Sequence, residues 1–153
     1  MRLNLKYVVK TYGDLTKEEL YKILRLRAQV FVVEQDCPYQ DVDNKDQIAR
    51  HVMGFKEDRL VAYTRLFKAG DYFKNASIGR VVVCKEDRKY GYGKDLMQIS
   101  IEQVMKYDQN NIIEISAQKY LKNFYNDLGF QQQGDEYLED NIPHILMIKS
   151  DFN

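Results

Sequence analysis

The chain has 153 residues, of which 44% are apolar and 30% charged, and its 23 Lys and Arg side chains balance 23 Asp and Glu side chains. This length suits one folded domain over residues 1–153, with a core that needs no metal or disulfide. A zero net charge argues against a dedicated nucleic-acid binder, which needs a basic surplus, and leaves only a local basic patch open. No apolar run approaches the ~18 residues of a membrane span, so a membrane is not an expected partner either. We expect neither nucleic acid nor membrane as a partner.

The two cysteines, Cys37 and Cys84, are not spaced as a metal or disulfide motif. The spacing predicts neither a zinc site nor a disulfide framework, and we expect no metal. Free thiols suit a reducing compartment. The first residues alternate apolar with polar side chains and contain no apolar stretch typical of a signal peptide, so a cytoplasmic protein is expected.

The N-terminal half predicts a strand, a helix and a hairpin. Alternating apolar residues predict a strand over 3–9. Thr16 and Glu19 form a capping box, which predicts a helix start, and Cys37-Pro38 ends that element. A polar, loop-like stretch with four Asp follows at 34–50. Two apolar runs around a polar turn then predict a hairpin with strands at 51–55 and 60–67.

The C-terminal half predicts four further strands and two helices. The run at 78–83 is continuously apolar, which predicts a strand buried on both faces, with a possible bulge at Gly79. The remaining predicted elements are a helix at 91–107, a strand at 112–117, a helix at 119–128 ended by Gly129, and closing strands at 130–133 and 144–148 around a polar loop. The order β-α-β-β-β-α-β-α-β-β predicts a mixed α/β fold, largely antiparallel, with one central β-α-β crossover.

One segment carries the chemistry. The strand ending at Val83 leads into Arg88-Lys-Tyr-Gly91-Tyr-Gly93-Lys94 and then into a helix. Glycines let the backbone N–H groups turn toward one point, and the helix start adds unpaired donors and the positive end of its dipole. Together these groups predict a cradle for a phosphate or pyrophosphate, with Arg88 and Lys94 at its rim. A plain strand-to-helix turn would also use glycine.

Two common nucleotide motifs do not fit this segment. The Rossmann fingerprint requires a third glycine, and Leu96 occupies that position. The P-loop requires Gly-Lys followed by Ser or Thr, whereas Asp95 follows Gly93-Lys94.

The arrangement resembles the GNAT N-acetyltransferases. In that family a strand ending in Val is followed by an acidic stretch, then by R/Q-x-x-G-x-G/A and a helix, and Val83, Glu86, Arg88, Gly91 and Gly93 match in step. A second segment, Asn123-Phe-Tyr-Asn-Asp-Leu-Gly-Phe130, resembles the family's later Y-x-x-x-G-F helix. Gln118 stands where the family usually has Asn. Residues 26–43, 51–54 and 142–144 further resemble the ElaA-like subgroup, so the likeness spans roughly 20–148.

The resemblance implies a GNAT fold: a mostly antiparallel twisted sheet with flanking helices, in which the strands at 78–83 and 112–117 splay apart. It implies an acyl-CoA co-substrate, expected to be acetyl-CoA, lying in that split. The backbone near Val82 or Val83 would polarise the thioester carbonyl. The residues expected to bind the co-substrate are Val81, Val82, Val83, Arg88, Lys89, Gly91, Tyr92, Gly93, Lys94, Gln118 and Asn123.

The family's reaction is direct attack by an amine on the thioester. Tyr125 resembles the general acid that protonates the CoA thiolate, although it could instead only pack against the sheet. The attacking ammonium must lose a proton, and the candidate bases are Glu34, Asp43, His51 and His144, with a water relay as the alternative. Of these, Glu34 and His144 join Tyr125 in the expected catalytic set.

Three further features bear on the acceptor and the route. Arg27 lies on the apolar face of the first helix, and we favour an internal ion pair with the 34–46 loop over a clamp for an acceptor carboxylate. The acidic residues of that loop could face a cationic amine or simply be solvated. Cys84 follows the acyl-binding strand, but a small buried thiol is commoner than an acyl-enzyme nucleophile.

The acceptor is expected to be a small-molecule or peptide amine, and a homodimer is one assembly open to the chain. The sequence leaves two alternative functions open. One is an acyltransferase like the acyl-homoserine-lactone synthases, which share the GNAT fold. The other is a GNAT module that binds acyl-CoA without catalysis.

Overall fold

The structure is a computed structural model that describes residues 2–108 and 111–150. Its strands are β1 (Lys6–Thr11), β2 (Arg50–Lys56), β3 (Arg59–Phe67), β4 (Ser77–Val83), β5 (Ile113–Gln118), β6 (Gln131–Glu139) and β7 (Ile142–Lys149). The α-helices are α1 (Lys17–Arg27), α2 (Tyr92–Tyr107) and α3 (Lys122–Asp127). A π-helix, η2 (Ala28–Glu34), continues α1, and short 3-10 turns are η1 (Tyr12–Asp14), η3 (Asp46–Ile48), η4 (Lys85–Tyr90) and η5 (Lys119–Leu121). The predicted order of elements is confirmed.

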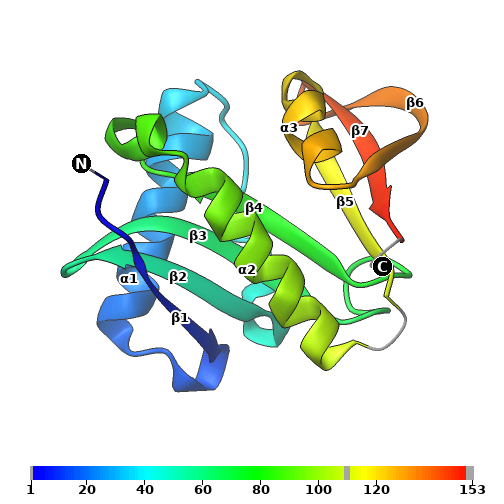
Figure 1. The fold of residues 1–153 in the computed structure, drawn as a ribbon. Coiled ribbons are helices and arrows are strands. Elements are labelled where there is room, and N and C mark those ends of the chain that lie inside the picture. The colour runs from blue at the N-terminus through cyan, green and yellow to red at the C-terminus, as the bar shows by residue number, and fades with distance from the viewer. Residues whose placement is uncertain (1, 109–110, 151–153) are drawn as a thin grey trace.

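The strands form two antiparallel sheets that meet at one point. One sheet has the order β1-β2-β3-β4 and the other β5-β7-β6. A parallel bridge between Ala76 and Ile113 joins them, and the Glu114 N–H donates to the Ala76 carbonyl at 2.8 Å. Beyond this bridge β4 and β5 diverge, with the η4–α2 turn on one side of the gap and α3 on the other (Figure 1). The predicted splay of these two strands is confirmed.

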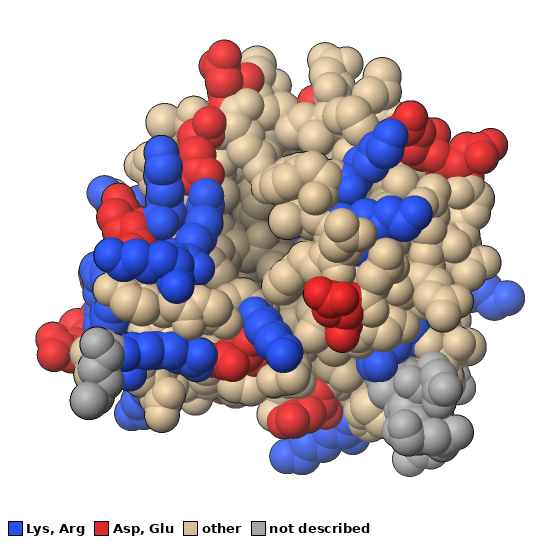
Figure 2. Space-filling view, turned by 45° about the horizontal axis from the view of Figure 1, so that its top comes forward, with Lys and Arg blue, Asp and Glu red and all other residues tan. Residues whose placement is uncertain are grey.

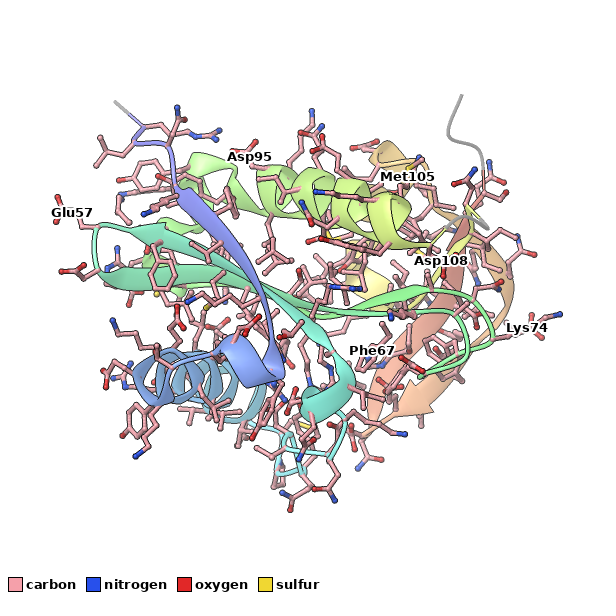
Figure 3. All side chains as sticks on the ribbon, turned by 90° about the horizontal axis from the view of Figure 1, so that it is seen from below. Glu57, Phe67, Lys74, Asp95, Met105 and Asp108 are labelled. Carbon is pink, nitrogen blue, oxygen red and sulfur yellow. The ribbon has the colours of Figure 1, made fainter. Side chains whose placement is uncertain are left out.

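Helices α1 and α2 cover opposite faces of the four-stranded sheet (Figure 3). The alternation of side chains along β2 explains how one sheet serves two cores: Val52 packs in the cluster with α2, and Met53 packs in the cluster with α1. The α2 cluster also contains Ile115 of β5 and Met147 of β7. Helix α2 therefore ties the two sheets together from one side. Within the described ranges, no helix has both the length and the apolar character needed to cross a membrane.

The capping box at the start of α1 is confirmed, because Thr16 Oγ1 accepts from the Glu19 N–H and the Glu19 carboxylate accepts from the Thr16 N–H. The helix does not run unchanged to Cys37-Pro38 as predicted. It widens to a π-helix at Ala28 and ends at Glu34. The first strand also begins later than the predicted 3–9, at Lys6.

The predicted closing strands were too short, and the polar loop between them is mostly strand. Strands β6 and β7 are joined by Asp140 and Asn141 alone, which take φ of 50° and 64°. Strand β6 is an edge strand with nearly all its side chains exposed, so it carries no apolar alternation that could have revealed it. Pro143 lies inside β7, opposite Leu138 and one residue before the pairing with β5 begins, where its missing N–H is tolerated.

Candidate active site

A cleft of about 690 Å³ opens where β4 and β5 diverge. Its walls come from the end of η2 and the following loop, from β4, from the η4–α2 turn, from β5 and α3, and from the β6–β7 turn. Figure 2 shows the molecule hollowed on one face, with Lys and Arg side chains gathered beside the hollow. The sequence-predicted site residues that line the cleft are Glu34, Val81, Val82, Val83, Arg88, Gly91, Gly93, Lys94, Gln118, Tyr125 and His144. Lys89, Tyr92 and Asn123 do not line it.

The start of α2 presents backbone donors to one end of the cleft. Gly91 precedes the helix with a left-handed φ of 74°, which a residue with a Cβ adopts at a cost. No side chain caps this end, so the first-turn N–H groups have no capping acceptor. A Cβ at Gly93 would lie 3.5 Å from the Phe124 ring across the cleft. The turn therefore combines free donors, the helix dipole and the Lys94 side chain, which is what a pyrophosphate requires.

Tyr92 belongs to the core and not to the cleft. Its side chain is fully buried, and its hydroxyl donates to the Leu3 carbonyl at 2.5 Å. The Arg2 guanidinium lies over its ring, 5.1 Å from the centroid. The Tyr92 side chain thus ties the N-terminal segment to the start of α2. The side chain does not reach the cleft, so the expected contact of Tyr92 with the co-substrate is left to its backbone N–H.

Arg88 connects two features that the sequence placed in separate roles. Its Nε donates to the Val83 carbonyl at 3.1 Å, at the end of β4. Its two terminal nitrogens donate to the two carboxylate oxygens of Glu34 at 2.6 and 2.9 Å. The candidate base Glu34 is therefore the partner of the candidate pyrophosphate ligand Arg88, with both of its oxygens in use.

Strand β4 is not buried on both faces as predicted. Gly79, Arg80, Val81 and Val83 are half-buried because the free edge of the strand lines the cleft. The irregularity foreseen at Gly79 lies one residue later, where Arg80 takes a φ of 50° and the register with β3 shifts. The bulge leaves this part of the strand edge irregular beside the cleft, where such features commonly serve a site.

Arg80 was missed by sequence reasoning, and its ion pairs hold the bulge in place. Its Nε donates to Asp41 Oδ1 at 2.7 Å and its Nη2 to the Asp41 carbonyl at 2.9 Å. The apolar run predicts the strand, but it does not indicate which partner an arginine inside that strand would bind.

Tyr125 lies on the opposite wall, where α3 presents it. Its ring packs edge-on against Phe124 and Phe130, with centroids 5.0 and 6.0 Å away, and only 5% of the residue is exposed. Burial raises the pKa of the Tyr125 hydroxyl well above its usual value. The group therefore keeps its proton throughout the neutral range, as a proton donor must.

Two contacts cross from the η2 side of the cleft to the three-stranded sheet. The side-chain amides of Gln35 and Gln118 bond reciprocally at 3.3 and 3.2 Å. The Cys37 thiol donates to the Asp140 carbonyl at 3.4 Å. Gln118, which replaces the family's usual Asn, is thus part of a bridge over the cleft, a role that its position in the sequence did not reveal.

His144 sits within a polar cluster on the wall formed by β5, β6 and β7. Its Nδ1 lies 2.7 Å from the Ile142 carbonyl and its Nε2 lies 3.3 Å from Glu139 Oε2. Ser116 Oγ donates to Glu139 Oε1 at 3.2 Å and lies 2.5 Å from the Tyr137 hydroxyl. The sequence singled out His144 alone, because its neighbours are scattered over three strands with no shared motif.

The other two candidate bases are structural. His51 is fully buried, with Nδ1 at 2.6 Å from the Tyr63 hydroxyl and Nε2 at 2.9 Å from the Asp46 carbonyl, and burial lowers its pKa. Asp43 is bound by Arg65 through two bonds of 2.8 and 2.7 Å. Neither residue lines the cleft. Their positions give no support to either candidate as the catalytic base.

Three aspartates of the acidic loop, Asp41, Asp43 and Asp46, face arginines of the same chain. Arg27, which is fully buried, donates to Asp41 at 2.9 Å and to Asp46 at 2.7 Å, so the predicted internal ion pair is confirmed. Arg65 binds Asp46 at 3.0 Å as well as Asp43. With Arg80 on Asp41, this network pairs Asp41, Asp43 and Asp46 with arginines, so these three aspartates are not free to attract a cationic acceptor.

Cys84 lies outside the cleft. Its thiol donates to Glu86 at 2.8 Å, and burial raises its pKa. Both facts oppose a thiolate nucleophile, because the thiolate is the reactive form.

The splayed strands, the glycine turn at a helix start and the cleft between them define a coenzyme A-dependent acyltransferase fold. The chain belongs to the GNAT family, because the protein-family model described as an acetyltransferase (GNAT) domain matches its residues 12–150. Protein ElaA of Escherichia coli is 41% identical over 140 residues, which cover 90% of this chain and 92% of that protein. The crystal structure of an acyl-CoA N-acyltransferase from Pseudomonas aeruginosa superposes with a TM-score of 0.89 at 39% identity, covering 95% of this chain and 99% of that chain. The chain is therefore an ElaA-like GNAT N-acyltransferase.

A more distant likeness concerns only the fold. The coenzyme A-dependent acyl-homoserine lactone synthase BjaI has a TM-score of 0.73 with 16% identity, over 95% of this chain and 82% of that chain. At this identity the two proteins share an architecture.

Proposed function

We propose that the protein transfers an acetyl group from acetyl-CoA to a primary amine by direct attack within a ternary complex. The observation that carries this proposal is that one cleft has both a helix N-terminus with uncapped donors at one end and a buried, protonated tyrosine on one wall. This combination serves both ends of an acyl-CoA, because the anionic pyrophosphate and the thioester sulfur need different partners.

The start of α2 holds the pyrophosphate. The N–H groups that follow Gly91 and the Lys94 ammonium supply its donors, and Arg88 contributes once it turns from Glu34. The pantetheine arm then runs along the half-buried edge of β4 at Val81–Val83. Backbone N–H groups at Val82 or Val83 polarise the thioester carbonyl, which stabilises the negative charge that develops on its oxygen.

Tyr125 supplies the proton that the departing sulfur takes up. Its hydroxyl is kept protonated by burial, and replacing a thiolate by a thiol makes the leaving group better. The acceptor approaches from the part of the cleft formed by the three-stranded sheet. No acyl-enzyme on Cys84 is involved.

Thiol release tests this function. The protein is incubated with acetyl-CoA and a panel of primary amines, and free CoA thiol is measured together with the acetylated amine. Equal amounts of both products support direct transfer. A panel of longer acyl-CoAs tests the acyl preference, and acyl transfer to S-adenosylmethionine tests the lactone-synthase alternative. Thermal stabilisation by acetyl-CoA without thiol release on any amine contradicts the proposed transfer, and no stabilisation at all contradicts acyl-CoA binding.

A further inference from the structure

Glu139 and His144 form a close pair on the cleft wall, away from the groups proposed to bind acyl-CoA and to protonate its sulfur. Glu139 ends β6 and His144 lies in β7, and both line the cleft. Their facing atoms, Glu139 Oε2 and His144 Nε2, are 3.3 Å apart. The His144 side chain is 8% exposed and the Glu139 side chain 45% exposed, so the pair is anchored on one side and open to a ligand on the other.

The hydrogen bonds around His144 determine how many protons this pair holds. The Ile142 carbonyl can only accept, so Nδ1, 2.7 Å away, carries a hydrogen. In a neutral ring with that tautomer, Nε2 presents a lone pair to a carboxylate oxygen. The contact is attractive only when one more proton lies between Nε2 and Oε2. The pair therefore has a place for one proton between Nε2 and Oε2.

Two hydroxyl groups hold the carboxylate in position. Ser116 donates its hydroxyl hydrogen to Glu139 Oε1, so the 2.5 Å bond between Ser116 and Tyr137 has Tyr137 as the donor. Burial raises the pKa of the Tyr137 hydroxyl, which keeps this donor protonated. The Tyr137 ring also stacks on His144, with centroids 6.2 Å apart and planes 24° apart. Tyr137 thus positions both members of the pair.

The charge of this wall favours a cation. Among the described residues, Glu34 lines the cleft but is bound by Arg88, whereas Glu139 and Asp140 line it without an ion pair to Lys or Arg. Asp41, Asp43 and Asp46 of the 34–46 loop are paired with Arg27, Arg65 and Arg80, and Asp36, which is exposed, does not line the cleft. The carboxylates next to His144 therefore provide the cleft's attraction for an ammonium group.

We propose that Glu139 and His144 together bind a cationic primary amine acceptor and act as its base, with Ser116 and Tyr137 as positioning residues. This assignment rests on the proposed acyl transfer. With the pair deprotonated, the carboxylate attracts the ammonium, and one N–H proton moves into the Nε2–Oε2 gap. The nitrogen lone pair then forms the C–N bond to the acyl carbon as the C–S bond breaks. The sulfur takes the Tyr125 proton, and the nitrogen passes its second proton through solvent to the Tyr125 phenolate. The proton held between Nε2 and Oε2 then leaves to solvent, so one proton is released per turnover.

An amine panel split by basicity tests the role of the pair. A primary alkylamine is an ammonium at pH 7, whereas hydroxylamine is already unprotonated and needs no base for its first step. We expect Glu139→Gln and His144→Gln to lower kcat/KM for alkylamines by about 10²- to 10⁴-fold, and for hydroxylamine by less than about fivefold. Tyr137→Phe, which keeps the ring stacking, should lower the alkylamine kcat by about tenfold with its KM little changed. Glu136→Gln, on the same strand but outside the cleft, is the matched control and should behave as wild type.

A binding measurement separates this proposal from the proposed function. Calorimetric titration of an alkylammonium into the complex with CoA needs no turnover, and Glu139→Gln should weaken it at least fivefold while the affinity for CoA stays the same. Equal loss of rate with both classes of amine, or unchanged amine binding in Glu139→Gln, would overturn the assignment. A wild-type protein that binds CoA and alkylammonium but acetylates neither class of amine contradicts acyl transfer itself, and the base with it.

Discussion

Arg88 and Glu34 are 54 positions apart in the chain and form a two-bonded ion pair, with N–O distances of 2.6 and 2.9 Å, at the cleft that both residues line. The pair links the end of η2 to the turn before α2. An anion entering this turn competes with the Glu34 carboxylate for the Arg88 guanidinium. We therefore expect acyl-CoA binding to be coupled to the position of η2.

Glu34→Gln tests this coupling. The amide cannot form the charged pair, so Arg88 is released for the pyrophosphate, and we expect the Kd for CoA to fall by about fivefold, which corresponds to ~1 kcal/mol for a partly exposed pair. The kcat should change by less than about threefold. Calorimetric titration with CoA and steady-state kinetics measure the two quantities, with Glu18→Gln on the exposed side of α1 as control. A hundredfold loss of kcat at unchanged Kd would instead make Glu34 the base.

Tyr125→Phe tests the proton donor. The phenyl ring keeps the contacts with Phe124 and Phe130, so the melting temperature should hold, while kcat should fall by about 10²- to 10⁴-fold because the thiolate leaves unprotonated. The exposed Tyr21 of α1 provides the matched Tyr→Phe control. Full turnover in a folded Tyr125→Phe protein would assign the tyrosine to packing alone.

Arg27→Ala tests whether the buried network is structural. Removing one partner leaves Asp41 and Asp46 short of a counter-charge in a buried place, which costs about 3–5 kcal/mol. We expect that loss in the free energy of unfolding, measured with urea, and near-normal kcat in the molecules that remain folded. Arg25→Ala removes an exposed arginine from the same helix and should leave stability nearly unchanged. Lost activity with intact stability would point to an acceptor clamp.

Acid should weaken the fold through Asp43. Burial by itself would raise the pKa of this carboxyl, but the hydrogen bonds and charge of Arg65 and the charge of Arg80 outweigh it and lower the pKa from 3.8 to about 2. Because the folded-state pKa lies below the unfolded one, the stabilisation is complete above about pH 4 and is lost as the pH falls toward 2. Its size is roughly 2 kcal/mol. Urea unfolding of wild type and Asp43→Asn should differ by about this amount at pH 5 and by much less at pH 2.5; a constant difference would contradict the ion-pair origin.

Those parts of the fold that depend on residues close together in the chain could be predicted from the sequence. The capping box at Thr16 and Glu19, the turn before Gly91 and the stop at Gly129 each depend on side-chain or backbone chemistry within a few residues, and each was confirmed. Strand β6 was missed in large part because an exposed edge strand needs no apolar alternation. The π-helix likewise has no local signature in Ala28–Glu34.

The cleft-lining residues that follow each other in the chain were predicted from the sequence. Those that only the fold brings together were missed. Val81–Val83 and the Gly91–Lys94 turn are contiguous, and they line the cleft with the exception of Tyr92. Glu139 and Ser116 meet His144 only through the pairing of three strands. Their spacing in the sequence therefore could not predict that they belong to the same site. Asp43 and His51 look like bases in the sequence, and only their buried partners identify them as structural.

The central claim is that acyl-CoA lies between β4 and β5 with its pyrophosphate at the start of α2. Backbone amide chemical shifts, followed by NMR as CoA is titrated into the protein, test this most directly. The largest changes should fall on the amides of residues 91–94 and of Val81–Val83, and pantetheine, which lacks both phosphates, should reproduce the changes in β4 but not those at 91–94. Changes concentrated on the exposed strand β6, or changes at 91–94 that are equal for the two ligands, would contradict the claim.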